Sequence, residues 1–194
     1  MIRHAYLTHP QVAIDPAVPV PRWGLSPIGR ARIEALVRDG WTSRFARIIA
    51  SEETKAIEAA EMIARALGRK IEVFDGLHEN DRSATGFLPP PEFEATANAF
   101  FASPLESVRG WERAIDAQAR ILRGVMRIAG SEPDTPTLFV GHGGVGTLLK
   151  CALSGRAIAR SEDQLPNGGG NHFGFTLRPD VLLYDWRAIE DAPP

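Results

Sequence analysis

The stretch Thr137-Leu138-Phe139-Val140-Gly141-His142-Gly143-Gly144 decides the fold, because an apolar run meets a glycine-rich turn there. Residues 137–140 have the composition of a buried strand, and a helix is expected from about 145 to 153. A strand that passes through such a turn into a helix is typical of layered α/β proteins. Ligands of these proteins bind beyond the carboxyl ends of the strands, so His142 is a candidate site residue.

The rest of the chain alternates in the same way. Ser26-Pro27 has the pattern of a helix start, Gly40 of its end, and Ser51 is expected to cap a second helix. Together these patterns predict a three-layer α/β/α sandwich with a mostly parallel central sheet. We expect one domain over residues 1–194, in which residues 81–110 form a lid or insertion segment. The further elements expected are strands at 47–50 and 70–74, helices at 91–101 and 111–129, and a hairpin at 171–177 and 181–186.

Composition narrows the class of protein. The chain has 194 residues with a formal net charge of -2, so no overall field recruits nucleic acid or an acidic membrane. Cys151 is the only cysteine, which excludes an intrachain disulfide and favours a reducing compartment. Residues 1–7 lack the basic and apolar regions of a signal peptide, and no apolar stretch is long enough to span a membrane. These features predict a cytoplasmic protein.

Four short segments carry side chains suited to chemistry: Arg3-His4, Ser51 with Lys55, Leu77-His78-Glu79 and Gly141-His142-Gly143. Three of them follow predicted strands, and Arg3-His4 does so if the chain begins as a strand. In one crevice they would gather two imidazoles, two cations and a carboxylate. That set suits phosphoryl transfer, in which catalysis consists mostly of positioning and of stabilising negative charge.

The same segments resemble the signature of a known family. Arg3-His4 looks like an Arg-His pair, residues 25–29 resemble Leu-Thr-x-x-Gly, and residues 51–60 are similar to Ser-x-x-x-Arg-Ala-x-x-Thr-Ala. Leu77-x-Glu79 and the segment 141–144 match the motifs of its acid and its second histidine. In this order, from Arg3 to about residue 149, the chain resembles the histidine phosphatase (phosphoglycerate mutase-like) superfamily.

The resemblance implies a phosphomonoester hydrolase that forms a phosphohistidine on His4. Arg3 would hold the phosphate oxygens, and His142 as imidazolium would stabilise the transition state. Glu79 would protonate the leaving oxygen and then activate water. No metal or organic cofactor is implied, and the substrate is expected to be a small organic phosphate or a phosphoprotein. The further phosphate ligands expected are Lys55, Gly143 and Thr8.

Several positions depart from the family pattern. Lys55 stands where the family has arginine, which keeps the charge but loses the two-pronged geometry. Ala5 replaces the glycine that follows the Arg-His pair. Only Met1 and Ile2 precede Arg3, so the first strand would be unusually short.

Alternatives stay open at this point. A non-catalytic phospholigand-binding protein on the same fold and a phosphoglycerate mutase-type phosphotransferase fit the same motifs. Gly141-x-Gly143-x-x-Gly146 satisfies a dinucleotide-binding pattern, but no apolar strand ending in an acidic residue follows it. A metallohydrolase is disfavoured because no His-x-x-x-His or Cys-x-x-Cys spacing occurs. We interpret His9, His78 and His172 as bystanders, with His9 and His78 near the mouth of the site.

Overall fold

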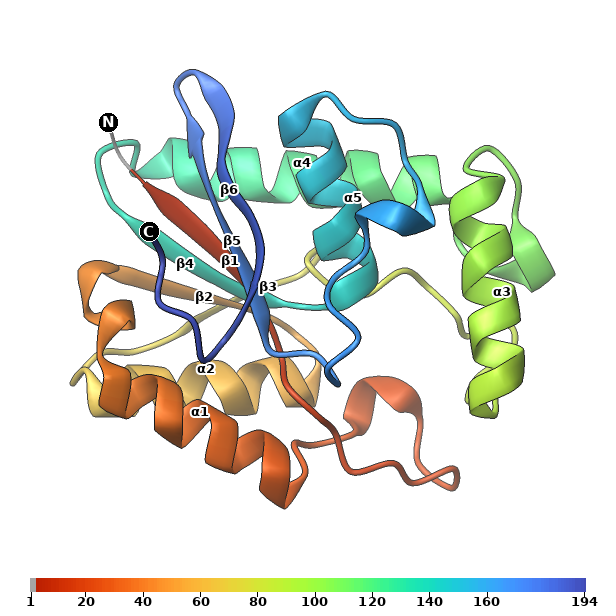
Figure 1. Ribbon diagram of the computed structural model, residues 1–194, viewed down its shortest axis with the longest axis horizontal. Coiled ribbons are helices and arrows are strands. Elements are labelled where there is room, and N and C mark those ends of the chain that lie inside the picture. The colour runs from red at the N-terminus through yellow and green to blue at the C-terminus, as the bar shows by residue number, and fades with distance from the viewer. Residues whose placement is uncertain (1–2) are drawn as a thin grey trace.

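A computed structural model describes residues 3–194, so Met1 and Ile2, which precede Arg3, lie outside the described residues. Within this range the sequence alternates between strands and helices along its length (Figure 1). The strands are β1 (His4–Thr8), β2 (Arg47–Ser51), β3 (Glu72–Phe74), β4 (Thr137–Gly141), β5 (Asn171–Leu177) and β6 (Asp180–Ala188). The helices are α1 (Pro27–Asp39), α2 (Thr54–Ala66), α3 (Pro90–Ala102), α4 (Ala114–Ser131) and α5 (Gly143–Ser154).

One six-stranded sheet with the order β3-β2-β4-β1-β5-β6 forms the centre of the protein. Strands β1 to β4 run parallel, whereas β5 pairs antiparallel with β1, and β6 pairs antiparallel with β5. The mostly parallel sheet expected from the sequence is therefore confirmed, and so is the carboxyl-terminal hairpin.

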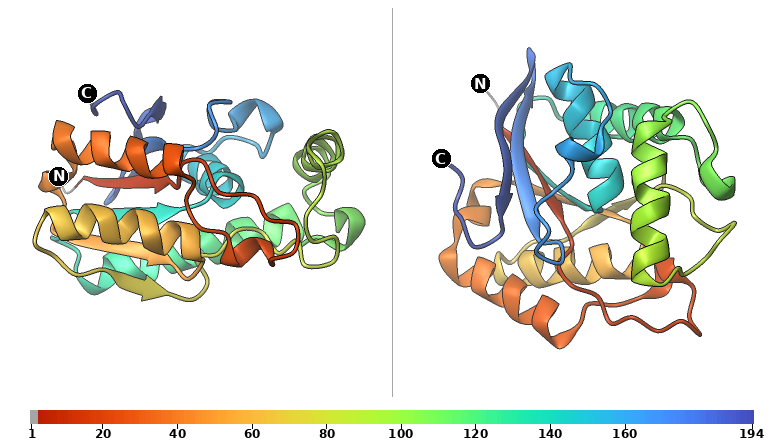
Figure 2. Two further views of the ribbon diagram at one scale, coloured as in Figure 1. Left: turned by 90° about the horizontal axis from the view of Figure 1, so that it is seen from below. Right: turned by 45° about the vertical axis from the view of Figure 1, so that its right-hand side comes forward.

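Helices cover both faces of this sheet, which confirms the three-layer sandwich (Figures 1 and 2). Side chains of α1 and α2, such as Ile33 and Ile63, pack with Leu7 of β1 on one face. Side chains of α4 and α5, such as Ile121 and Leu148, pack with Tyr6 on the other face. Because neighbouring side chains of a strand point to opposite faces, β1 contributes to both cores. Helix α3 stands beyond the carboxyl ends of the parallel strands (Figure 1).

Both ends of α1 match their sequence signals, whereas the start of α2 does not. The Ser26 side chain accepts a hydrogen bond of 3.0 Å from the Gly29 N–H, and Gly40 ends α1 with φ 82°. Ser51, however, is the last residue of β2 rather than a cap. Helix α2 begins at Thr54 with Glu53 in the N-cap position, so the expectation for Ser51 is wrong.

The first strand also differs from the expectation. Arg3-His4 lies at its amino end, since β1 runs from His4 to Thr8 and its carboxyl end leads into His9. The His4 ring packs between Phe139 and Phe175, at centroid distances of 6.4 and 5.5 Å. Burial lowers the pKa of His4 to about 4, so this ring is neutral in the folded protein at pH 7. His4 is thus a buried histidine of the core.

Tyr6 connects the central strand to the turn after β4. Its hydroxyl donates to the His142 carbonyl oxygen at 3.2 Å and accepts from the His142 N–H at 2.9 Å. The Tyr6 side chain is buried, and its ring stacks on Phe173 at 5.5 Å. The hydroxyl therefore bonds to both backbone groups of His142, whose carbonyl oxygen also accepts from the Gly146 N–H at 3.0 Å, and it fixes the backbone that carries this histidine.

We expect Tyr6→Phe to lower the free energy of unfolding by about 1–3 kcal/mol, because the His142 N–H stays buried without a partner. Urea denaturation of the variant and wild type at pH 7.5 measures this loss. Tyr184→Phe is the matched control, since its hydroxyl bonds, among residues 3–194, only to the His172 ring near the edge of the sheet. Equal stability of Tyr6→Phe and wild type would contradict the role of the hydroxyl.

The buried neutral state of His4 predicts a pH dependence of stability. The pKa of His4 is near 6.5 when unfolded and about 4 when folded, so the unfolded state binds more protons as the pH falls below 6.5. His4 therefore costs stability between about pH 6.5 and pH 4, at up to ~1.4 kcal/mol per pH unit. We expect His4→Asn to flatten the stability profile measured by urea denaturation at pH 7.5, 6 and 5. Parallel profiles for wild type and variant would refute a neutral His4.

Candidate active site

The carboxyl ends of β1, β2 and β4 bring polar residues together at one edge of the sheet. Thr8 of β1 pairs with Gly141 of β4, and the His9 N–H donates to the Gly141 carbonyl oxygen at 2.9 Å. His9 and His142 follow these two strands directly, and their ring centroids lie 5.2 Å apart with the planes at 69°. Two imidazoles thus face each other at the place where ligands of parallel α/β sheets bind.

His9 has the hydrogen bonding of a nucleophile. Its Nδ1 lies 2.9 Å from the Pro10 carbonyl oxygen, which only accepts hydrogen bonds, so Nδ1 carries the proton. Burial, with smaller contributions from His142 and Lys55, lowers the pKa of His9 to about 3. The ring is therefore neutral near pH 7, and the lone pair lies on Nε2. Nε2 makes no hydrogen bond within residues 3–194, which leaves it free for a substrate.

The His142 side chain is fully buried beside His9. Its Nε2 lies 2.7 Å from Ser51 Oγ and 3.6 Å from Glu53 Oε1, while its buried Nδ1 has no partner among the residues described. Burial lowers the pKa of His142 to about 4, although Glu53 and Glu79 act in the opposite direction. A phosphate dianion placed beside this ring would favour its protonated form.

Glu79 occupies the amino end of α5. Its carboxylate accepts hydrogen bonds from the Gly144 N–H at 3.1 Å and the Val145 N–H at 2.9 Å. Burial alone raises the pKa of Glu79, but Arg82, His142 and the Val145 N–H outweigh burial and lower it. Glu79 is ionised in the ligand-free protein, as a general base requires.

Glu53 and Lys55 form a buried ion pair beside the two histidines. Lys55 Nζ donates to Glu53 Oε2 and, at 2.9 Å, to the Val20 carbonyl oxygen. Glu53 Oε1 accepts from the Glu79 N–H at 2.9 Å. Burial raises the pKa of Glu53, but His142 and Lys55 bring it down to about 2. The charge of Lys55, expected to face phosphate, is therefore balanced by Glu53.

The expectation that Arg3 and His4 share this crevice is wrong. His4 precedes Ala5, which pairs with Leu138 near the start of β4, whereas His142 follows the end of β4. Three residues of extended strand separate His4 from Thr8, and the four steps between them span about 13 Å. Arg3 is exposed at the same amino edge. The structure places His9, not His4, beside His142 and Glu79.

Thr8 and Gly143 lie at the carboxyl edge as expected, but the Thr8 hydroxyl is already engaged. It donates to Gln164 Oε1 at 2.8 Å and accepts from the Asn171 N–H at 2.9 Å. Thr8 therefore anchors the start of β5, which argues against a contact with phosphate. The Gly143 N–H is not one of the two that Glu79 binds, so it stays available at the helix end.

A cavity of about 1060 Å³ opens onto Glu53 and Glu79. One wall is the proline-rich segment 16–22, and the other is the segment 78–87, whose Phe87 ring lies 5.6 Å from Trp23. The lining residues with charged or imidazole side chains are Arg22, Glu52, Glu53, His78, Glu79, Asp81 and Arg82. His78 lines the cavity as expected, whereas His172 is buried elsewhere and bonds to Tyr184 and the Asp191 carbonyl oxygen.

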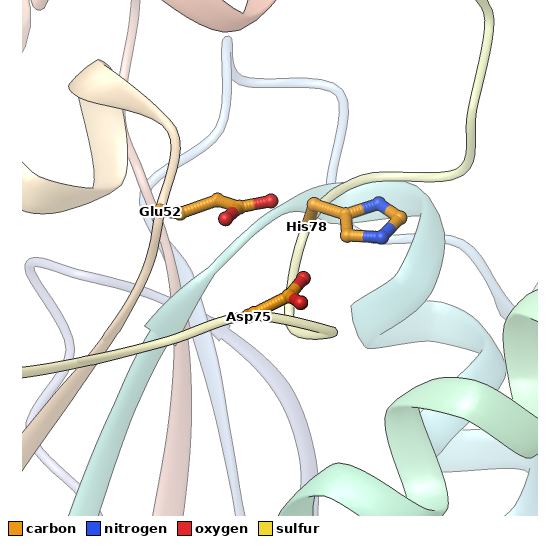
Figure 3. A group of neighbouring side chains, drawn as sticks. All are labelled: Glu52, Asp75 and His78. Atoms are coloured by element: carbon orange, nitrogen blue, oxygen red, sulfur yellow. The ribbon is translucent and has the colours of Figure 1, made fainter.

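One group of side chains near this cavity could hold a metal ion. Glu52, Asp75 and His78 offer ligand atoms within 4.8 Å of one another (Figure 3). Glu52 and Asp75 are exposed. The sequence spacing did not reveal the group, because Glu52 follows β2 whereas Asp75 and His78 follow β3. Within residues 3–194, no helix is long and apolar enough to cross a membrane.

Sequence reasoning missed His9 and Glu53, although a signal existed for the first. Ala5-Tyr6-Leu7 is an apolar run, and the rule that sites follow strands points to Thr8-His9 rather than to Arg3-His4. Glu53 had no such signal, because an acidic residue before a helix is ordinary as a partner of the helix dipole. Only the fold shows that its carboxylate is buried between Lys55 and His142.

Comparison with solved structures gives the same fold in several phosphatases. A mycobacterial glucosyl-3-phosphoglycerate phosphatase in complex with inorganic phosphate has a TM-score of 0.77 at 21% identity, over 98% of this chain and 100% of that chain. Phosphoserine phosphatase from Entamoeba histolytica has a TM-score of 0.76 at 15% identity, over 97% and 98% of the two chains. A putative alpha-ribazole-5'-P phosphatase from Escherichia coli has a TM-score of 0.75 at 14% identity, over both chains completely.

Comparison with curated protein sequences gave no match. A family model matches nearly the whole chain, over residues 1–178, which include His9, Glu79 and His142. The chain therefore belongs to the histidine phosphatase superfamily (branch 1).

Proposed function

We propose that this protein is a phosphomonoester hydrolase that forms a phosphohistidine on His9. The observation that supports this most strongly is the hydrogen bond between His9 Nδ1 and the Pro10 carbonyl oxygen, which directs a lone pair on Nε2 into the site. The His142 ring lies against the His9 ring, and the Glu79 carboxylate accepts a hydrogen bond from an N–H at the amino end of α5. A nucleophile, an oxyanion stabiliser and an acid-base carboxyl group are thus adjacent.

In the first step, His9 Nε2 forms a bond to phosphorus while the bond from phosphorus to the ester oxygen breaks. The leaving oxygen keeps the electron pair and takes a proton from protonated Glu79. A phosphate dianion beside Glu79 opposes the effect of Arg82 on this carboxyl group and favours its protonated form. The proton stays on His9 Nδ1, and its hydrogen bond to the Pro10 carbonyl oxygen stabilises the positive charge of the phosphorylated ring.

In the second step, water attacks phosphorus and the phosphorus–nitrogen bond breaks. Glu79, now a carboxylate, takes the proton of the water, and the electron pair returns to His9 Nε2. Inorganic phosphate leaves, and Glu79 holds the proton needed for the next first step. Each atom and proton is accounted for without a metal or an organic cofactor.

The substrate class follows from the cavity and the charge. A volume of about 1060 Å³ accommodates a small organic phosphate with room for a leaving group. A net charge of -2 supports a small phosphate ester or a phosphoprotein side chain rather than nucleic acid. The segment 81–110 is proposed as the lid, and the single cysteine supports a cytoplasmic location.

A metallohydrolase is the second candidate, and Glu52, Asp75 and His78 are the observation that favours it. If a chelator abolished turnover and a divalent ion restored it, the activity would be assigned to a metal ion held by these three residues. Tight phosphate binding without turnover would instead favour a non-catalytic phospholigand-binding protein. Transfer of phosphate to an acceptor other than water would favour a mutase-type phosphotransferase.

We expect His9→Asn to abolish hydrolysis of an aryl phosphate, a loss of at least about 1000-fold, because the nucleophile is removed. His4→Asn is the matched control, since His4 is a buried histidine at the opposite edge of the sheet. It should keep turnover within about twofold of wild type. Release of phosphate is measured in a chelating buffer. The reverse result, activity that depends on His4 but not on His9, would refute the assignment.

Glu79→Gln should lower the rate of the first step more for alkyl phosphates than for aryl phosphates. An aryl oxide leaves without a proton, whereas an alkoxide needs one from Glu79. Rapid-quench assays should therefore show a burst of phenol release from the variant, followed by slow turnover because water is no longer activated. An alkyl phosphate should give no burst, with a rate reduced by about 100- to 10000-fold. An equal reduction of the first-step rate for both substrates would contradict the role of Glu79 as proton donor.

A further inference from the structure

A phosphate dianion entering this site needs a positive counterion, and the expected ones are not free. The residue directly before His9 is Thr8, where the family resemblance calls for an arginine. Lys55 is tied to Glu53 and to the Val20 carbonyl oxygen. Glu53 and Glu79 add negative charge next to neutral His9 and His142. Without another cation, these carboxylates would repel the phosphoryl group.

Arg82 is a free cation at the right place. It lines the cavity three residues after Glu79 and is half-buried. Its guanidinium makes no hydrogen bond or ion pair with any residue from 3 to 194, whereas arginines such as Arg120 and Arg47 are paired with carboxylates. A half-buried guanidinium without a counterion is in a costly state that an anionic ligand would relieve.

Aromatic rings hold Arg82 in position. The guanidinium carbon lies 5.2 Å from the centroid of Phe93 and 5.6 Å from that of Trp111. These rings belong to α3 and to the start of the segment that leads into α4. Stacking of this kind restricts the long side chain and leaves the edge of the fork free for oxygen atoms. Arg82 is therefore ordered before any ligand arrives.

The field of Arg82 reaches the two groups that flank the reacting phosphorus. Arg82 is the largest charge effect that lowers the pKa of Glu79, and it also lowers the pKa of His142. Arg22, the other arginine of the cavity, is exposed. It is not among the main causes of the pKa shift of Glu79 or of His142. Arg82 is thus the cavity arginine whose charge acts on the site itself.

We infer that Arg82 binds the phosphoryl group that His9 receives, in place of the arginine absent at Thr8. The ligand class is the dianion of a phosphomonoester, and inorganic phosphate as the product binds the same way. This inference rests on the proposed function for its reaction, but the anion site can be tested by binding alone. A role in packing the lid through its aromatic contacts would instead leave phosphate affinity unchanged when the charge is removed.

The test compares Arg82→Gln, Arg82→Lys and Arg127→Gln, the last on the exposed face of α4. Inhibition by inorganic phosphate and orthovanadate is measured with an aryl phosphate, together with kcat and KM. We expect Arg82→Gln to weaken phosphate binding and lower kcat/KM by about 10- to 150-fold, the range for one lost charged hydrogen bond or two. Arg82→Lys should restore part of both, because it keeps the charge, and Arg127→Gln should match wild type.

A phosphate inhibition constant within about twofold of wild type in folded Arg82→Gln would overturn the inference. So would a loss confined to substrates with a second anionic group, because Arg82 would then bind the leaving group. If the wild type hydrolyses no phosphate ester, calorimetry with inorganic phosphate decides the point separately. Phosphate binding that Arg82→Gln weakens would then support the anion site while the proposed function fails.

Discussion

The parallel pairing of β1 with β4 is the contact on which the site depends. Thr8 lies opposite Gly141, and the His9 N–H bonds to the Gly141 carbonyl oxygen, so the residues after both strands emerge side by side. Tyr6 then ties the His142 backbone to β1 from within the sheet. A shift of this register by one residue would turn every side chain of β1 to the other face and separate the two histidines.

Charge balance is the second constraint on this site. The buried carboxylate of Glu53 and the half-buried carboxylate of Glu79 stand beside two neutral imidazoles. Glu53 is compensated by Lys55, and Glu79 by the amino end of α5 and by Arg82. An anionic substrate can bind only if one of these positively charged groups also contacts the substrate. The aromatic support of Arg82 and the restraint of Lys55 make Arg82 the group that is free to do so.

Much of the fold was predictable from the sequence, because periodic apolar residues and helix-end signals are local. Ser26, Gly40 and the run before Gly141 each marked an element that the structure contains. His142 was selected because it follows a predicted strand, whereas Glu79 was selected because it matches the acid motif of the family. The sequence pointed to His4 rather than to the proposed nucleophile His9, because the dipeptide Arg3-His4 matched the family pattern at the amino end of the strand. Dipeptides carry no information on register, which only the pairing of Thr8 with Gly141 supplies. Glu53 and Arg82 could not be found locally, because their roles come from neighbours far along the chain.

Mapping the phosphorylated residue tests directly whether His9 carries the phosphoryl group. The wild-type protein is mixed with an aryl phosphate, quenched in alkali within milliseconds and digested, and the phosphopeptide is located by mass spectrometry. We predict a phosphoryl group on His9, in the peptide that follows the first strand, which forms and decays at rates no slower than turnover. A phosphoryl group on His4 or His142, or hydrolysis in which no phosphorylated peptide forms, would contradict it.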